Sequence, residues 1–160
     1  MLLSSILSFT LAAAAPAPTP PALTTFDSPE EAAVHILELA YQHLPYFEVG
    51  GVITRVSPGK YAIGKPHTDY SGHSVEIEED PDAYQGVIVA TYHTHPCLDH
   101  THIPGEFSDE DMKSTRITGH EGFMADLCTG EVHAAKPGID TEAKGRIVGK
   151  FPVVYKRLED

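Results

Sequence analysis

The sequence predicts a single α+β domain in which a mixed β-sheet is flanked by helices. A helical pattern comes first, a group of short strand patterns follows it, and a second helix precedes a further group of strands. Helices and strands in this order, without regular alternation, are typical of an α+β domain of two or three layers. The 160 residues are enough for one domain with a substantial buried core.

The N-terminal segment differs in composition from the rest of the chain. Residues 1–15 form an apolar run that is too short to span a bilayer and ends in small residues, so we interpret it as a secretory signal peptide. No Lys or Arg precedes the apolar run, which leaves a disordered N-terminus as the alternative. Residues 16–26 form a Pro-rich spacer, and the domain is expected over residues 27–160. We therefore expect a secreted or periplasmic protein.

The first predicted helix begins with N-terminal capping signals. Ser28 is a capping residue, Pro29 suits the first helical position, and Glu31 stands three residues after the serine, as in a capping box. Apolar residues follow at helical spacing until Pro45 ends the pattern. These apolar positions are Ala33, Ile36, Leu37, Ala40 and Leu44.

Strand patterns follow this helix. The last of them is a buried-type run before Pro96, where a strand must end because proline cannot donate to a sheet. An acidic turn is expected at residues 78–82. The expected strands cover residues 47–54, 61–63 and 75–78, together with a strand that opens at residues 87–90 and ends before Pro96.

The second half of the chain predicts a helix and then three strands. A turn at Thr129–Gly130 joins two of the strands into a β-hairpin, and Pro152 indicates that the last strand is an edge strand or contains a bulge. These elements are a helix from Asp109 to about Ile117, hairpin strands over 122–127 and 131–135, and a final strand over 147–155.

The charge of the chain excludes some classes of partner. The formal net charge is −12, and Lys and Arg form no cluster. Nucleic acids and anionic membrane surfaces require a basic patch, so we expect neither as a partner, and no membrane association of the mature protein.

Two histidines and an aspartate provide a candidate zinc site. His93 and His95 stand two apart in a strand, so both imidazoles lie on the same face. Asp111 adds a carboxylate in the first turn of the second helix. Two neutral imidazoles and one carboxylate, with a fourth position left to water, are typical of catalytic zinc sites.

Each part of this pattern also has a structural interpretation. Ser108-x-x-Asp111 is a capping device at a helix N-terminus, and His-x-His is often a half-buried pair on the polar face of a strand. A further alternative is a histidine-rich tract that includes His100 and His102 and binds metal loosely. The succession of Glu48, His-x-His-Pro and Ser-x-x-Asp along the chain favours a catalytic site.

The three motifs together resemble the signature of the JAMM (JAB/MPN+) metalloproteases. Glu48–Gly51, His93–Pro96 and Ser108–Asp111 match it in order, and the resemblance covers about residues 45–136. The motifs are especially similar to bacterial JAB-like domains of unknown function. The resemblance implies a JAB/MPN-like fold with the layered architecture of cytidine deaminases. The chain departs from the family at residues 97–107, a longer gap than usual, which puts substrate preference in doubt more than metal binding.

The resemblance also implies a role for each residue. His93, His95 and Asp111 would hold Zn²⁺ and activate a water molecule. Glu48 would be the general base that takes the proton of this water. Ser108 would direct its hydroxyl at the oxyanion of the tetrahedral intermediate. A surface glutamate is the alternative for Glu48, but its apolar neighbours favour an inward placement.

These roles imply an exported zinc metallopeptidase or isopeptidase that hydrolyses an amide or isopeptide bond. Peptides, isopeptides and peptidoglycan-like substrates are the expected partners. The alternative function is a secreted zinc-binding or interaction module without catalysis. The chain lacks the motifs of two other classes of zinc enzyme. It has no His-Glu-x-x-His, the motif of the common metalloproteases, and only Pro96-Cys97 matches part of the deaminase signature.

The chain has two cysteines, Cys97 and Cys128. In an exported protein they are expected to pair as a disulfide that restrains the loop over residues 97–107. A free Cys97 near histidines would instead be a candidate nucleophile.

Overall fold

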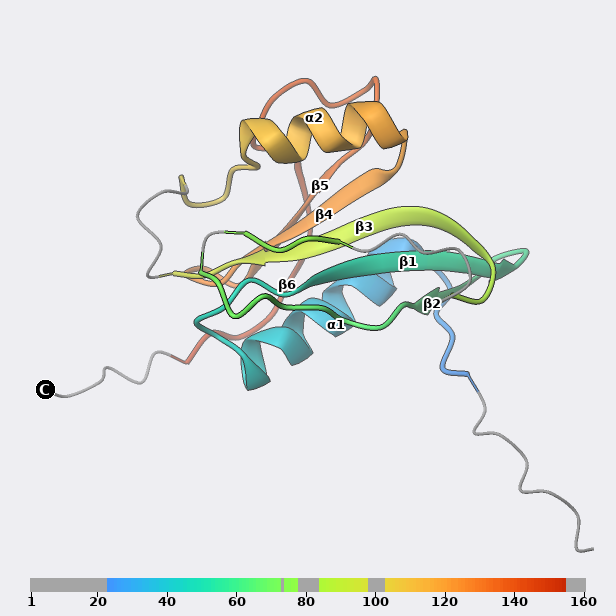
Figure 1. Cartoon of the computed structure of the whole chain (residues 1–160), viewed down its shortest axis with the longest axis horizontal. Coiled ribbons are helices and arrows are strands. Elements are labelled where there is room, and N and C mark those ends of the chain that lie inside the picture. The colour runs from blue at the N-terminus through green and yellow to red at the C-terminus, as the bar shows by residue number, and fades with distance from the viewer. Residues whose placement is uncertain (1–22, 73, 78–83, 98–102, 155–160) are drawn as a thin grey trace, which may run out of the picture.

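A computed structural model describes residues 23–72, 74–77, 84–97 and 103–154, and Figure 1 shows a curled β-sheet with a helix on each side. This arrangement confirms the expected α+β class with a mixed sheet and flanking helices. The elements in chain order are α1 (Pro29–His43), β1 (Gly50–Ser57), β2 (Lys60–Ile63), β3 (Val87–His95), α2 (Asp109–Thr118), β4 (Glu121–Asp126), β5 (Glu131–Ala135) and β6 (Arg146–Lys150).

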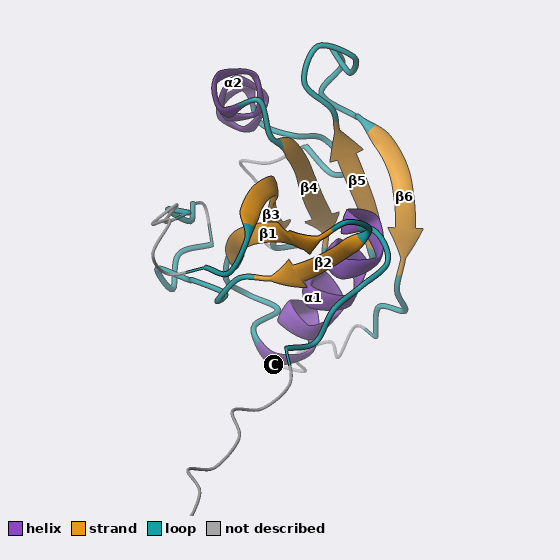
Figure 2. Cartoon of the chain, turned by 90° about the vertical axis from the view of Figure 1, so that its right-hand side faces the viewer, coloured by secondary structure: helices purple, strands orange, loops and turns teal. Residues whose placement is uncertain are grey.

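The six strands form one sheet in the order β2-β1-β3-β4-β5-β6. Neighbouring strands are antiparallel except β3 and β4, which run parallel. Parallel neighbours need a crossover connection, and α2 supplies it. Figure 2 shows α2 and α1 on opposite sides of the strands. The crossover brings the start of α2 back toward the end of β3, where the two candidate histidine ligands lie.

The two faces of the sheet bury different sets of side chains. Tyr92, Phe123 and Val132 contribute to the larger core, which also contains Leu37 of α1. Side chains alternate along a strand, so His93 lies on the opposite face, toward α2. A smaller core on that face consists of Phe107, Met112, Met124 and Ala135.

The structure confirms the first predicted helix and its cap. The Ser28 hydroxyl accepts a hydrogen bond from the Glu31 amide at 3.0 Å. The Glu31 carboxylate accepts from the Asp27 amide, also at 3.0 Å, so the reciprocal bond falls one residue earlier than in a regular capping box. The helix ends at His43, before Pro45, and its apolar stripe packs on the sheet.

The strand expected at residues 75–78 is wrong for the residues that the structure describes, which are 74–77. β1 pairs with β2 and β3, and Gly50 at its start also pairs with His67, so this segment is not a neighbour of β1 in the sheet. The Glu76 amide donates instead to the Asp69 carboxylate at 3.1 Å. Val75 packs close to Gly50, where an added Cβ would lie 2.8 Å from a Val75 methyl carbon.

Two strand boundaries also differ from those expected. β1 begins at Gly50 rather than at residue 47, and β6 ends at Lys150 rather than at residue 155. The Phe151 amide still donates to the Gly130 carbonyl at 3.0 Å, but Pro152 has no amide hydrogen with which to continue. β6 is an edge strand, as the proline indicated. The other predicted strands, the hairpin and the second helix are confirmed within a few residues.

Several predictions concern residues outside the described part of the chain. They include the signal peptide over residues 1–15, the acidic turn at residues 78–82, and both His100 and His102. Phe26, the last residue of the expected spacer, is described and pairs with Tyr61 of β2. No helix among the described residues has the length and apolar character needed to cross a bilayer.

Candidate metal centre

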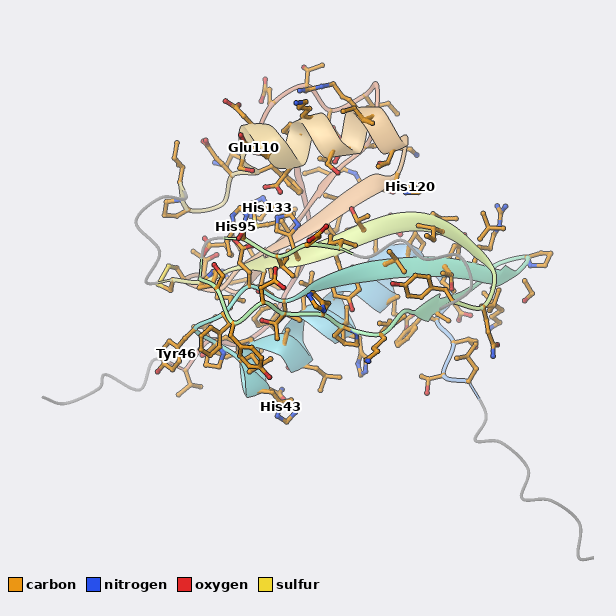
Figure 3. The ribbon with its side chains drawn as sticks, in the orientation of Figure 1. His43, Tyr46, His95, Glu110, His120 and His133 are labelled. Carbon is orange, nitrogen blue, oxygen red and sulfur yellow. A yellow bond between two sulfur atoms is a disulfide. The ribbon has the colours of Figure 1, made fainter. Side chains whose placement is uncertain are left out.

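Two of the candidate ligands occupy the C-terminal end of β3. The Nε2 atoms of His93 and His95 lie 3.1 Å apart, and both residues are buried. The strand places them on one face because they are two residues apart. In Figure 3, His95 lies between the sheet and α2, on the side opposite α1.

Asp111 brings the third ligand from the first turn of α2. Its Oδ2 atom lies 3.3 Å from His93 Nε2 and 3.4 Å from His95 Nε2. Potential ligand atoms of the three residues all lie within 4.8 Å of one another. The predicted trio is therefore brought together, and the group could hold a metal ion.

The Ser108–Asp111 pair forms a complete capping box at the start of α2. The Ser108 hydroxyl accepts from the Asp111 amide at 3.1 Å, and the Asp111 carboxylate accepts from both the amide and the hydroxyl of Ser108 at 2.8 Å. The capping interpretation of this motif is thus confirmed. It does not exclude metal binding, because the carboxylate that caps the helix also faces the two histidines.

Glu48 is buried, with 4% of its surface exposed, although it lies just before β1 rather than within a strand. Gly50 is paired with His93, so an extended chain two residues earlier places the Glu48 side chain on the same face. The negative charge of Glu48 is also one of the causes that raise the pKa of His93. These observations agree with the inward placement that was expected for Glu48.

The charges at the centre shift two pKa values in opposite directions. Burial disfavours the charged form of His93, but the charge of Asp111, a hydrogen bond with it and the charge of Glu48 outweigh burial and raise the His93 pKa. Burial likewise opposes ionisation of Asp111. The charge of His93 and hydrogen bonds from His93, His95 and Ser108 outweigh it and hold the Asp111 pKa well below its usual range.

Sequence reasoning missed Thr94, which lies between the two histidines. It is fully buried, and its hydroxyl bonds to the backbone on both sides of Glu48. The sequence does contain a sign of its role. Thr94 is polar, but it lies on the same face of the strand as Tyr92, which faces the main core. The motif itself treats this position as variable.

His133 is a second residue that the sequence did not single out. It lies on the same face as His93, because Met124 is paired with both of them across neighbouring strands. Its Nδ1 atom is 2.9 Å from the Lys144 carbonyl, which can only accept, so Nδ1 carries the proton. The fully buried ring thereby holds the loop before β6 against the sheet.

The structure contains the expected disulfide between Cys97 and Cys128. It joins the end of β3, two residues after His95, to the turn between β4 and β5. Phe107, at the other end of the loop, is buried, and its ring centroid lies 6.2 Å from that of His93. The pairing removes Cys97 as a free nucleophile.

Comparison with protein-family models, with curated proteins and with solved structures finds no match for this chain. Chemically, the centre combines two imidazoles, one carboxylate ligand and a further buried carboxylate that is not part of the ligand group.

Proposed function

We propose that this chain is an exported zinc-dependent hydrolase of JAMM type that cleaves an amide or isopeptide bond. The observation that carries the proposal is the convergence of His93, His95 and Asp111 beside the buried Glu48. Three segments that are far apart in the sequence supply these residues.

The donor set and its spacing fit zinc. Ligand atoms about 2.0–2.2 Å from a tetrahedral zinc ion lie about 3.3–3.6 Å from one another. The separations between the Nε2 atoms and Asp111 Oδ2 are 3.1, 3.3 and 3.4 Å, close to this range. Two histidines and one carboxylate leave the fourth position for water or substrate, as in catalytic sites.

A zinc ion held by these residues would supply a polarised water molecule and a Lewis acid for the scissile carbonyl. Glu48 would accept the proton of the attacking water and return it to the leaving amine. Glu48 is not one of the three candidate ligands, which suits this role, because a base must contact the water rather than the metal. Peptides, isopeptides and peptidoglycan cross-links all contain the bond that this chemistry cleaves.

The disulfide supports export. Disulfides persist in oxidising compartments and are rare where thiols are kept reduced. The pair Cys97–Cys128, together with the apolar N-terminal run, therefore favours a secreted or periplasmic location.

One observation favours the non-catalytic alternative, a secreted zinc-binding module. The Ser108 hydroxyl is engaged by the Asp111 carboxylate at 2.8 Å, whereas an oxyanion donor must direct its proton at the substrate. Catalysis would require this hydroxyl to rotate away from Asp111 when substrate binds. A binding module would have no such requirement.

Metal analysis and an activity screen test the proposal together. Purified protein should retain about one zinc ion per chain after dialysis, and alanine at His93, His95 or Asp111 should abolish retention. His43→Ala is the control, because His43 is exposed on α1, away from His95 in Figure 3. Equal sensitivity to alanine at His100 and His102 would instead support the loose histidine tract.

The activity screen should offer peptide and isopeptide libraries and purified peptidoglycan. We expect cleavage that a chelator abolishes and zinc restores. Cleavage that persists without metal would contradict the proposal. Full zinc retention with no cleavage of any of the three substrate classes would favour the binding module.

A further inference from the structure

We propose that Thr94 is the residue that positions Glu48 as the general base, an inference that rests on the function proposed for this centre. Thr94 is the variable residue of His-x-His-Pro. Its two neighbours point toward the metal centre, whereas its own side chain points to the other face of β3. From there it holds the backbone that carries Glu48.

The hydroxyl of Thr94 makes two hydrogen bonds to the segment around Glu48. It donates to the Phe47 carbonyl at 3.2 Å and accepts from the Val49 amide at 2.9 Å. These groups belong to the peptide units immediately before and after the Glu48 Cα atom. A single side chain therefore restrains Glu48 from both sides.

This arrangement replaces regular strand pairing. The Thr94 amide donates to the Val49 carbonyl at 3.0 Å, as in an antiparallel ladder, but the return bond from the Val49 amide goes to the Thr94 side chain. The strand β1 consequently begins only at Gly50. The hydroxyl accepts one bond and donates another, which serine can also do and valine cannot.

A further backbone contact, made by Glu48 itself, comes from a different segment. Its amide donates to the Ser71 carbonyl at 2.7 Å. Thr94 itself is fully buried, so water does not compete for its hydroxyl bonds. The backbone of Glu48 is thus held on both sides. The side chain that takes part, that of Thr94, belongs to the strand that carries His93 and His95.

This placement gives β3 control over both parts of the reaction. A general base must lie within about 2.6–3.2 Å of the proton it abstracts, and a displacement of about 1 Å can lower a rate about 10²-fold. The two histidine ligands and the residue that holds the base are consecutive in one strand. A shift of β3 would therefore move them together, and loss of the Thr94 hydroxyl would move only the base.

The test uses cobalt(II)-substituted full-length protein, because its visible spectrum reports on the centre without a known substrate. Thr94→Val removes the hydroxyl at nearly constant shape. Thr54→Val is the matched control, since Thr54 is also buried and lies in β1 at a distance from residues 47–49. Thr94→Ser and Thr94→Ala form a second pair that differs by the hydroxyl alone and serves if the valine variant does not fold.

We expect Thr94→Val to keep its bound cobalt, because all three ligands remain. The measured quantity is the pH at the midpoint of the change in the visible cobalt spectrum. In Thr94→Val this midpoint should shift in the same direction as in Glu48→Gln, by a smaller amount. Thr94→Ser should behave like the parent protein and Thr94→Ala like the valine variant. On any substrate found in the activity screen, kcat should fall about 10²-fold with little change in KM.

A double variant separates positioning from general stability. If Thr94 acts through Glu48, Thr94→Val should produce no further spectral shift when Glu48 is already Gln. An equal shift in both backgrounds, or a Thr94→Val midpoint equal to that of Thr54→Val, would overturn the inference alone. A Glu48→Gln midpoint equal to that of the parent protein would instead remove the general base on which the proposed function depends.

Discussion

At the residue scale, the centre places opposite charges next to each other in a buried position. The pKa of His93 is raised and that of Asp111 is lowered, largely because each group faces the other. A proton on His93 therefore occupies the position that a metal ion would take. Metal binding must displace it, since zinc binds only the neutral imidazole.

The sign of each shift defines a pH window for the metal-free protein. The raised His93 pKa stabilises the fold fully below its ordinary value of 6.5, and this contribution is lost as the pH rises through the folded-state value. The lowered Asp111 pKa contributes above 3.8, its ordinary value, and is lost as the pH falls through the folded-state value. Both contributions are present together between these ordinary values.

We predict that zinc raises the melting temperature more at about pH 7.5 than at about pH 5.5, because protons compete for His93 at the lower pH. Thermal denaturation with and without zinc at a series of pH values measures this difference. His93→Ala should remove the increment at every pH. An increment that does not change with pH would contradict proton competition at this residue.

Glu48→Gln should separate catalysis from metal binding. The substitution keeps the shape of the side chain and removes the base, so activity should fall by about 10²–10⁴-fold while zinc content and melting temperature stay close to the parent values. Elemental analysis and steady-state kinetics measure the two effects. Chelator-sensitive cleavage that survives the substitution would exclude Glu48 as the general base.

At the scale of the element, α2 connects fold to site through its first turn. The helix is capped by Ser108 at its start and by Gly119 after Thr118, and the Gly119 φ of 71° lies in the left-handed region that favours glycine. Asp111 stabilises the helix N-terminus and faces the histidines at the same time. Changes to the cap should therefore affect the metal centre, whereas changes to an equivalent cap elsewhere should not.

The two capping serines provide a matched comparison. Ser108→Ala and Ser28→Ala should each lower the free energy of unfolding by about 0.5–2 kcal/mol through loss of a helix cap. Only Ser108→Ala should also lower the hydrolytic rate, by about 10²–10³-fold if its hydroxyl is an oxyanion donor. Chemical denaturation and kinetics on both variants test this. Equal rates in the two variants would limit Ser108 to capping.

At the scale of the whole molecule, the sheet order decides which segments meet. The parallel pair β3 and β4 requires the α2 crossover, which returns Asp111 to the end of β3. The Cys97–Cys128 disulfide links the same end of β3 to the β4–β5 turn and closes a span of 31 residues. The candidate metal centre thus lies near this disulfide, because His95 is two residues before Cys97.

Removing this disulfide should lower the free energy of unfolding by about 2–4 kcal/mol, mainly because the unfolded chain gains conformational entropy. The double substitution Cys97→Ser with Cys128→Ser, compared with the oxidised parent by urea denaturation, measures the effect. Intact mass after alkylation, with and without prior reduction, checks that the parent is oxidised. Two alkylated thiols in the non-reduced sample would contradict the pairing.

The sequence by itself determined the features that depend on near neighbours. The cap at Ser28, the capping box at Ser108 and the β-hairpin around Thr129–Gly130 were all predictable, because their hydrogen bonds join residues a few positions apart. The common face of His93 and His95 follows in the same way from the two-residue repeat of a strand. Local geometry was sufficient for each of these.

Only the tertiary structure decided which strands pair and which segments stay outside the sheet. Residues 75–77 alternate like a strand but form none, and the Glu76 amide donates to the Asp69 carboxylate instead. Glu48 lies outside β1, because the Thr94 hydroxyl takes a bond that the ladder would otherwise make. The physical reason is the same in both cases. Segments that are distant in sequence compete for the same backbone hydrogen bonds, and a local sequence pattern does not indicate which of them forms the bond.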